Sequence, residues 1–116
     1  LSLPKPYGYL YDDHEKLIVD FARLKRDPIS RLLFGNLVKG EELGVPALEN
    51  VSFRFSRRQV DLDSSQAMPT VRVNNRPLIG HMAIQDRTWI GTHGRLFSFM
   101  LSPVTADMEP SLADDD

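Results

Sequence analysis

The sequence contains no cysteine, which excludes a disulfide framework, a thiolate nucleophile and a cysteine-based zinc site. No apolar run approaches the ~20 residues that a membrane-spanning helix needs, and no signal-peptide pattern opens the chain. A sustained apolar spacing of 3.6 residues is also missing, so we expect almost no helix. A chain of 116 residues, 41% of them hydrophobic, is nonetheless long enough to bury one core as a single domain.

The formal net charge of -2 is unevenly distributed along the chain. From Val104 onward there are five acidic side chains and no basic one, whereas the rest carries 14 basic and 11 acidic side chains. Five arginines lie between Arg54 and Arg76, accompanied by only two aspartates. This local positive charge suits an anionic ligand, but it is too small and too mixed for a nucleic-acid interface. We expect neither nucleic acid nor a membrane as a direct partner.

Short runs of alternating apolar residues recur along the chain and are separated by turn residues, which is typical of a β-sandwich or small barrel. In the last run, Phe97, Phe99 and Leu101 share one face. Residues 21–27 can form a short helix that Pro28 would end. The expected strands are 7–11, 16–21, 29–34, 43–45, 51–55, 58–62, 70–73, 82–84, 88–90 and 95–101.

These runs divide the chain into three parts. Residues 1–6 read as a lead-in, residues 7–102 as one β-sandwich, and residues 103–116 as an acidic tail that we expect to be disordered. Trp89 precedes Ile90 in an expected strand and is interpreted as a core residue. His93-Gly94 is interpreted as a hairpin turn.

A hydroxyl and two guanidiniums follow one another in the run Ser56-Arg57-Arg58-Gln59. Arginine forks and a serine hydroxyl suit a phosphate group, because they donate several hydrogen bonds to its oxygens at fixed geometry. As ordinary turn residues, the same arginines would cover apolar surface with their stems. Adjacent strand residues point to opposite faces, so we expect at most one of the two arginines to aim directly at a ligand.

These motifs, in their order and spacing over residues 7–101, resemble the forkhead-associated (FHA) family of phosphothreonine-recognition domains. The family's signature is Gly-Arg after an early strand, then Ser-x-x-His, then an Asn-Gly pair. The matching positions here are Gly35-Asn36, residues 56–59 and Asn74-Asn75, and residues 82–91 and 96–99 match the closing hairpin. The resemblance implies an all-β, FHA-like (SMAD/FHA) β-sandwich of about eleven short strands. It also implies peptide-binding loops at one end of the sandwich and both chain termini at the other.

Two positions depart from the family's pattern, so the phosphate-binding signature is degenerate. The family's phosphate-contacting arginine is replaced by Asn36, whose amide can donate a hydrogen bond but carries no charge. Arg31, Lys39 or Arg58 could supply charge from a neighbouring loop. Gln59 replaces the family's bracing histidine and still offers a donor and an acceptor. The resemblance thus implies this phosphate-binding set: Ser56, Arg57, Arg58, Asn36 and Lys39.

A second set is expected to order the bound peptide. The family's peptide-gripping Thr-Asn-Gly segment corresponds to residues 64–69, which contain no asparagine. For Asn74 a structural role in its turn is favoured over direct peptide contact, and Asn75 stands where glycine is usual and tolerates a positive φ. Arg72 and Arg76 either select an acidic residue beside the phosphothreonine or are ordinary solvated strand residues. The expected peptide-binding set is Ser64, Ser65, Gln66, Arg72, Asn74 and Arg76.

Nothing in the sequence indicates an enzyme or a metal site. His14, His81 and His93 are scattered and lack the i, i+4 spacing of a metal-binding pair. The carboxylates cluster in turns, and neither a Gly-x-Ser-x-Gly elbow nor a P-loop is present. We therefore expect no catalytic residue, no metal and no cofactor.

The sequence predicts an interaction module that binds a phosphothreonine-containing segment of a partner protein. Loss of the family's arginine leaves a second interpretation open, a phosphate-independent FHA-like scaffold within a larger complex. A third is an unrelated small β-sandwich, such as a viral or carbohydrate-binding module. Strand topology separates the third from the others, because an FHA domain has its first and last strands side by side. The family prior favours an intracellular, nuclear location, while no motif indicates the partner's identity or the oligomeric state.

Overall fold

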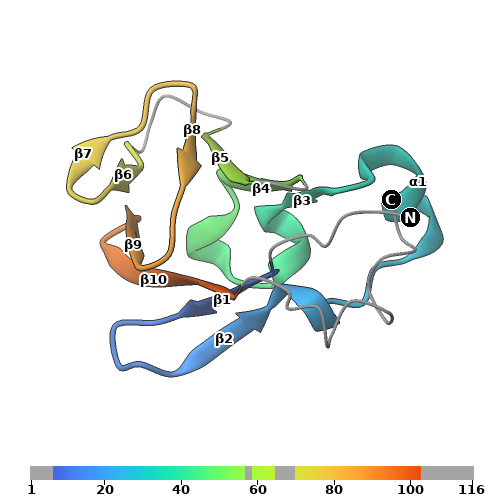
Figure 1. Ribbon diagram of the computed structural model, residues 1–116, viewed down its shortest axis with the longest axis horizontal. Helices are drawn as coiled ribbons and strands as arrows, with labels where there is room; N and C mark the ends of the chain where they lie inside the picture. Colours follow the sequence, from blue (N-terminus) through green and yellow to red (C-terminus); the bar gives the residue numbers. More distant parts are fainter. Residues whose placement is uncertain (1–6, 57–58, 65–69, 103–116) are drawn as a thin grey trace.

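The computed structural model describes residues 7–56, 59–64 and 70–102, which form two antiparallel sheets packed face to face (Figure 1). The six-stranded sheet has the order β2-β1-β10-β9-β6-β7, and the four-stranded sheet has the order β3-β4-β5-β8. The expected all-β sandwich is confirmed. The strands are β1 (Tyr7–Tyr11), β2 (Leu17–Asp20), β3 (Leu37–Lys39), β4 (Val51–Phe55), β5 (Val60–Ser64), β6 (Arg72–Val73), β7 (Arg76–Pro77), β8 (His81–Ile84), β9 (Thr88–Thr92) and β10 (Arg95–Ser102).

The first and last strands lie side by side, as expected for an FHA-like sandwich. β1 pairs antiparallel with β10, with Tyr7 opposite Ser102 and Leu10 opposite Phe99. The hairpin turn expected at His93-Gly94 joins β9 to β10, and both residues have the positive φ of a primed turn (52° and 71°). No helix within the described ranges is long and apolar enough to cross a membrane.

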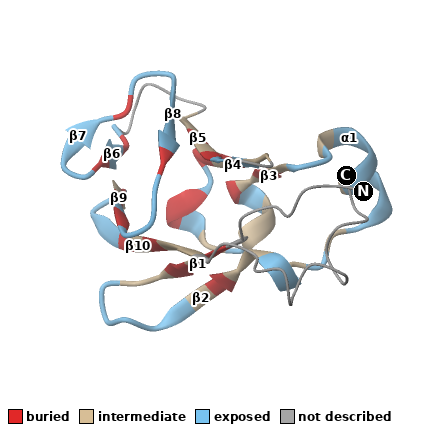
Figure 2. Ribbon diagram, in the orientation of Figure 1, coloured by how far each residue is buried: buried red, intermediate tan, exposed pale blue. Residues whose placement is uncertain are grey.

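The buried residues lie between the two sheets (Figure 2), and three aromatic side chains pack together in this core. Phe53 of β4 stacks on Phe99 of β10, with ring centroids 6.1 Å apart and no solvent exposure of either side chain. Phe21 closes one end of the core, with its ring 4.9 Å from Phe53 and 5.1 Å from Phe55. Offset ring pairs of this kind contribute beyond the area that they bury, so they fix how the two sheets sit on each other.

The strand expected over residues 29–34 is wrong, because this segment is a helix, α1 (Pro28–Phe34). The side chain of Asp27 caps it by accepting a hydrogen bond from the backbone N–H of Ser30 (2.6 Å). Pro28 occupies the first turn, where a missing N–H costs nothing, so it begins this helix rather than ending an earlier one. Of residues 21–27, only the 3₁₀ helix η1 (Phe21–Arg23) is helical.

Two smaller expectations are also wrong. Residues 43–45 form no strand, since they end the 3₁₀ helix η2 (Gly40–Leu43) and lead into the 3₁₀ helix η3 (Pro46–Leu48). Trp89 is not a core residue, because 46% of it is exposed while Ile90 is fully buried. Neighbouring strand residues face opposite sides of a sheet, and Ile90 takes the inner side.

Gly40 is a position where packing demands glycine. A Cβ there would overlap the backbone carbonyl of Leu48 and crowd the carbonyl of Val51. Gly40→Ala is therefore expected to lower the free energy of unfolding by about 1–3 kcal/mol, measured by urea denaturation. Gly91→Ala is the matched control, because no atom lies closer than 3.9 Å to its Cβ position. Equal losses in the two variants would contradict this account.

Candidate functional site

The four-stranded sheet has two ends, and they divide the expected site residues. One end, the hairpin end, comprises Asn36, Ser56 and Gln59, since Leu37 lies opposite Arg54 and Phe55 lies opposite Val60. The other, the far end, comprises Gly40, Asn50 and Ser64, since Val51 lies opposite Ser64. The last strand, β10, also ends near the hairpin end. The N–H of Leu101 in β10 donates to the carboxylate of Asp86. Asp86 comes two residues after Ile84, and Ile84 pairs with Val60 beside the hairpin.

Ser56 closes the β4–β5 hairpin. Its hydroxyl donates to the carbonyl of Gln59 (3.0 Å) and accepts from the N–H of Gln59 (3.3 Å), while its own N–H donates to the same carbonyl (3.0 Å). Gln59 does not brace a loop from behind, because it is exposed and its amide nitrogen donates to the carboxylate of Asp61 (3.0 Å). Arg57 and Arg58 lie outside the described residues.

Asn36 lies beside Ser56, and a backbone contact fixes this proximity. The carbonyl of Asn36 accepts a hydrogen bond from the N–H of Phe55 (3.1 Å), the residue before Ser56. The backbone of Lys39 lies three residues further along β3, but its ammonium lies over the ring of Phe34, 4.8 Å from the centroid. Since Phe34 precedes Asn36 by two residues, the Lys39 charge sits at the α1–β3 junction.

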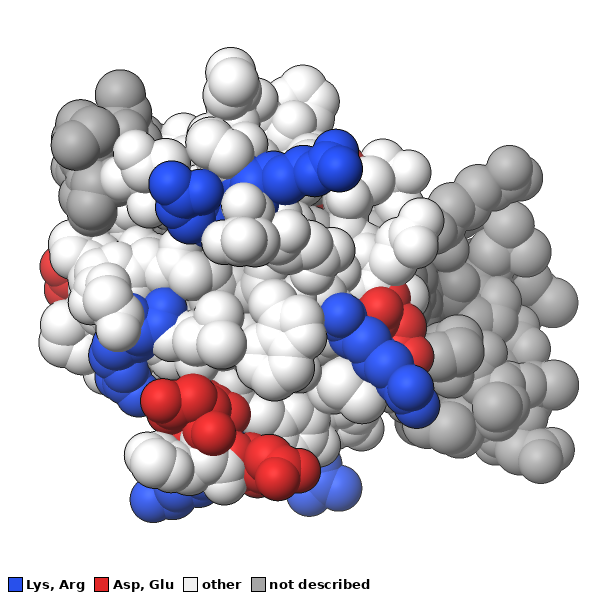
Figure 3. Space-filling model, turned by 90° about the vertical axis from the view of Figure 1, so that its left-hand side faces the viewer, with Lys and Arg blue, Asp and Glu red and all other residues white. Residues whose placement is uncertain are grey.

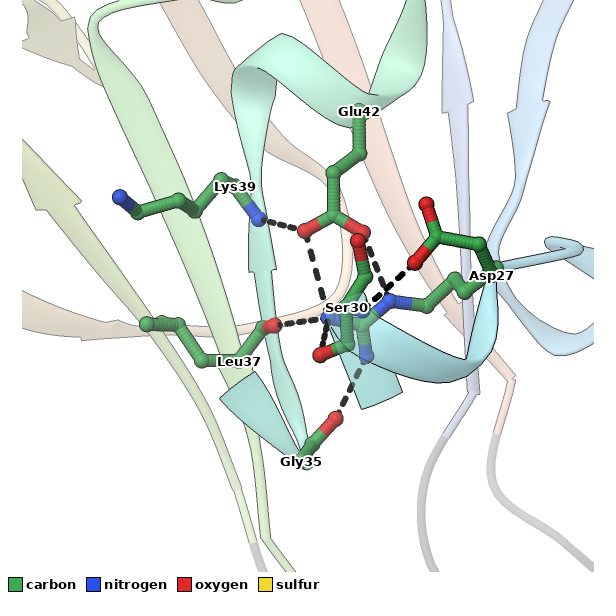
Figure 4. A network of polar contacts seen from close by, with 7 residues as sticks. Asp27, Ser30, Gly35, Leu37, Lys39 and Glu42 are labelled. Atoms are coloured by element: carbon green, nitrogen blue, oxygen red, sulfur yellow. Dashed lines mark hydrogen bonds and ion pairs between the residues drawn. The ribbon is translucent and has the colours of Figure 1, made fainter. Parts of the chain in front are cut away.

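The segment that carries Asn36 is held by the side chain of Arg26, whose partners Gly35, Leu37 and Glu42 are labelled in Figure 4. Its guanidinium donates to the carbonyls of Gly35 (2.5 Å) and Leu37 (2.8 Å), on either side of Asn36. It also forms an ion pair with Glu42 (2.7 Å), and the two side chains are only 10% and 16% exposed. The same carboxylate accepts from the backbone N–H of Lys39 (2.9 Å). One arginine thus ties η2, β3 and the end of α1 together.

The expected peptide-binding residues do not gather beside Ser56. Ser64 lies at the far end, where its N–H donates to the carbonyl of Gly80 (3.1 Å), and Ser65 and Gln66 lie outside the described residues. Arg72 and Arg76 belong to the other sheet, and the guanidinium of Arg72 donates to the carbonyl of Asn75 (3.4 Å). On the side of the molecule shown in Figure 3, the basic groups are separated by uncharged surface, and acidic side chains lie beside two of them. The described residues of this side therefore form no concentrated basic patch.

The structural role expected for Asn74 is confirmed. Its N–H donates to the carbonyl of Trp89 (2.8 Å), and its side-chain oxygen accepts from the N–H of Trp89 (2.9 Å). Asn74 and Asn75 both have a positive φ (50° and 69°), which asparagine tolerates better than most residues. Asn74, Arg76 and Gln85 line a hollow of about 450 Å³. Gln85 directly follows Ile84, which pairs with Val60 at the hairpin end. The hollow therefore opens near the hairpin end.

The far end contains further residues, Gly40, Glu41 and Asn50, that the sequence did not identify as site candidates. Asn50 is buried, and its side-chain oxygen accepts from the hydroxyl of Thr92 (3.3 Å), so it links the start of β4 to the other sheet. Gly40 is the glycine that directly follows an early strand, and the next residue is the exposed Glu41. Glu49 and Asp63 add further acidic charge nearby. A phosphate dianion would meet like charge at this end.

Hydrogen bonds from backbone N–H groups lower the pKa of two carboxyl groups among the described residues. The N–H of Ser30 holds the pKa of Asp27 below its ordinary value, and that of Lys16 does the same for the pKa of Asp12. Among the described residues, no three His, Asp or Glu side chains come close enough to hold a metal ion.

No protein-family model matches the chain, and no curated protein matches it. Several solved structures do. An FHA domain studied for phosphothreonine-dependent interactions gives a TM-score of 0.61 at 13% identity, over 84% of this chain and 99% of that one. The FHA domain of an Arabidopsis thaliana hypothetical protein gives a TM-score of 0.60 at 13% identity, over 91% of this chain and 92% of that one. The FHA domain of Rv0020c gives a TM-score of 0.56 at 13% identity, over 84% of this chain and 94% of that one. The chain therefore has the FHA fold.

Removing the Arg26 guanidinium is expected to destabilise the segment that carries Asn36. Arg26→Met leaves Glu42 and two carbonyls without their donor, which should lower the free energy of unfolding by about 3 kcal/mol in urea denaturation. Arg23→Met is the control, because Arg23 is 88% exposed and its contact with Asp20 (3.7 Å) is a solvated ion pair. A similar, small loss in both variants would show that the network contributes nothing.

The Asp27 cap predicts a pH dependence for α1. Because the pKa of Asp27 is lowered in the folded chain, the cap stabilises the helix fully above the ordinary carboxyl pKa and is lost as pH falls through the lowered value. The amide proton of Ser30, followed by NMR, should titrate at that lowered pKa. Asp27→Asn keeps a capping oxygen and should abolish the titration. An unchanged Ser30 titration in this variant would assign it to another group.

Proposed function

We propose that this chain is a non-enzymatic interaction module that binds a phosphothreonine-containing segment of a partner protein, and that the phosphate binds at the hairpin end. Ser56 and Asn36, joined through the backbone of Phe55, are the proposed first contacts. The sequence adds two guanidiniums directly after Ser56, and Lys39 contributes a third cation at the α1–β3 junction. The single observation that carries this proposal is that Asn36, just before β3, and Ser56, just after β4, lie at the same end of the sheet.

Charge supports the hairpin end over the far end. A phosphothreonine carries nearly two negative charges at neutral pH and accepts charge-assisted hydrogen bonds. Arg54 lies on β4 opposite Asp61, and the sequence adds Arg57 and Arg58 between Ser56 and Gln59, whereas Glu41, Glu49 and Asp63 fall at the far end. The peptide would continue from the hairpin past Gln85 into the hollow, where Arg76 can meet an acidic residue that flanks the phosphothreonine.

The fold supports the same class of function. One similar structure is an FHA domain studied for phosphothreonine-dependent interactions. A second candidate function is a phosphate-independent scaffold, and the acidic residue after Gly40 favours it. In that case the far end would contact an unphosphorylated partner surface.

The two functions are separated by titrating the full 116-residue chain with a degenerate phosphothreonine peptide library and with its unphosphorylated twin. We expect binding to the phosphorylated library only. Ser56→Ala with Arg58→Ala should weaken it at least 10- to 100-fold, because each lost charged contact costs roughly 1.5–3 kcal/mol. Lys16→Ala, which removes an exposed charge from the β1–β2 turn, is the control and should leave binding unchanged.

Equal binding of the two libraries would establish the scaffold instead. If the Ser56→Ala, Arg58→Ala variant still binds only the phosphorylated library, the chain binds phosphothreonine, but the binding site is not at the hairpin end.

A further inference from the structure

Strand β8 forms one edge of the four-stranded sheet and faces β6 and β7 of the other sheet across the hollow (Figure 1). The N–H of Ser64 donates to the carbonyl of Gly80, and this bond sets the alternation of the β5–β8 ladder. The backbone groups of Met82 therefore face β5, whereas those of His81 and Ala83 face away from it. Within the described ranges, the outward N–H and carbonyl of these two residues have no hydrogen-bond partner. The edge of β8 thus presents free backbone donors and acceptors.

The other sheet edges carry features that discourage pairing with a further strand. At β3, the opposite edge of the same sheet, the Arg26 guanidinium donates to the carbonyl of Leu37 (2.8 Å). The Glu42 carboxylate accepts from the N–H of Lys39 (2.9 Å), so these outward backbone groups of β3 are already bonded. Strand β7 has only two residues, and one is Pro77, which has no N–H. Strand β2 pairs with β1 through a shift in register. Among the described strands, β8 is therefore the edge best suited to accept another strand.

The open stretch of β8 lies close to the hairpin end. It ends at Gln85, whose N–H and carbonyl both bond to the hydroxyl of Thr88 (3.1 and 2.7 Å). Just before it, Ile84 pairs with Val60, the first residue of β5 after the hairpin. Neighbouring strands lie about 4.8 Å apart and an extended residue spans about 3.3 Å. A segment whose phosphothreonine binds at the hairpin end therefore reaches the β8 edge within a few residues.

The hollow beside β8 suits a single extended segment. Met82 of β8 lines it on one side, and Val73, Asn74 and Arg76 line it on the other. Because the β6–β7 turn walls the hollow, the sheet edge of a second folded copy cannot reach β8. An apolar side chain of the segment that enters the hollow would contact Met82, which is 37% exposed.

The opposite side of the β8 edge is acidic. Ala83 lies opposite Asp61 on β5, and the Ala83 methyl is small enough for a longer side chain to lean across it. The Asp61 carboxylate accepts a hydrogen bond from the amide of Gln59 but forms no ion pair with a described residue. Opposite charges on neighbouring strands stabilise a sheet, so the position beside Ala83 suits lysine or arginine.

We propose that the partner segment that carries the phosphothreonine binds as an added strand on the free edge of β8. Its backbone exchanges hydrogen bonds with His81 and Ala83, and its inward side chains enter the hollow. A basic side chain beside Ala83 pairs with Asp61. This mode of binding rests on the proposed function and adds to it a requirement on the backbone and on the flanking sequence.

The test is a scan of backbone N-methylation along the phosphothreonine peptide selected from the library, titrated against the full 116-residue chain. N-methylation removes one backbone donor and changes no side chain. In an added strand only alternate N–H groups face the neighbouring strand. We expect a loss of affinity of about 10-fold or more at alternate residues of the flanking segment. The residues between them are the controls and should show no loss.

Ala83→Pro removes the outward N–H from the chain itself. Proline is tolerated on an edge strand where the N–H faces away from the sheet, so the urea midpoint should stay unchanged while peptide binding weakens about 10-fold. Ala83→Ser keeps the N–H and is the matched control that should bind normally. In Asp61→Asn, replacing the peptide's basic residue with glutamine should cost less affinity than in the unchanged chain. Equal costs in the two backgrounds would overturn the pairing with Asp61.

The outcomes separate strand addition from the proposed function. Phosphate-dependent binding without alternation in the scan, and with full binding to Ala83→Pro, would overturn strand addition and leave the phosphothreonine proposal intact. Equal binding of the unphosphorylated twin would overturn the phosphothreonine proposal, whereas alternation in the scan of that twin would still support strand addition. If Ala83→Pro does not fold, the scan decides by itself, because it changes only the peptide. A library that yields no binding peptide would overturn both proposals.

Discussion

The ion pair between Arg26 and Glu42 fixes the part of the molecule on which the proposed phosphate site depends. It lies almost out of solvent and satisfies the carbonyls of Gly35 and Leu37 from one guanidinium. Because those residues flank Asn36, the ion pair positions Asn36 beside the Ser56 hairpin. A lysine could not replace this arginine, since its ammonium lacks the planar fork that reaches several acceptors at once.

The two ends of the four-stranded sheet differ in chemistry. Among the described residues, the hairpin end combines the Ser56 hydroxyl with the side-chain amides of Asn36 and Gln59, whereas the far end combines Gly40, the buried Asn50 and several carboxylates. The family resemblance implies binding loops opposite the chain termini, yet the last strand finishes near the hairpin end. The molecule thus keeps the FHA fold, while the phosphate site that we propose lies at the other end from the one that the resemblance implies.

The strands were predictable where one face is apolar and the other polar, as in Phe97 and Phe99 of β10. The turn role of Asn74 was also predictable, because a positive φ and a local side-chain acceptor are properties of that residue type. Helix α1 was missed because its aliphatic run also suits a strand, and the decisive signals, Asp27 and Pro28, act only through cap geometry. The site could be predicted only in part. Residues within one run stay together in the fold, but only strand register shows that Ser56 and Ser64 lie at opposite ends of the sheet.

The most direct test of this account is an NMR titration of the isotope-labelled chain with a phosphothreonine peptide selected from the library, following every backbone amide. The account predicts that the amides of Asn36, Ser56 and Gln59 shift together and saturably, and that those of Gly40, Asn50 and Ser64 do not. Shifts concentrated at Gly40, Asn50 and Ser64 would contradict it, and so would shifts of the same size with the unphosphorylated peptide.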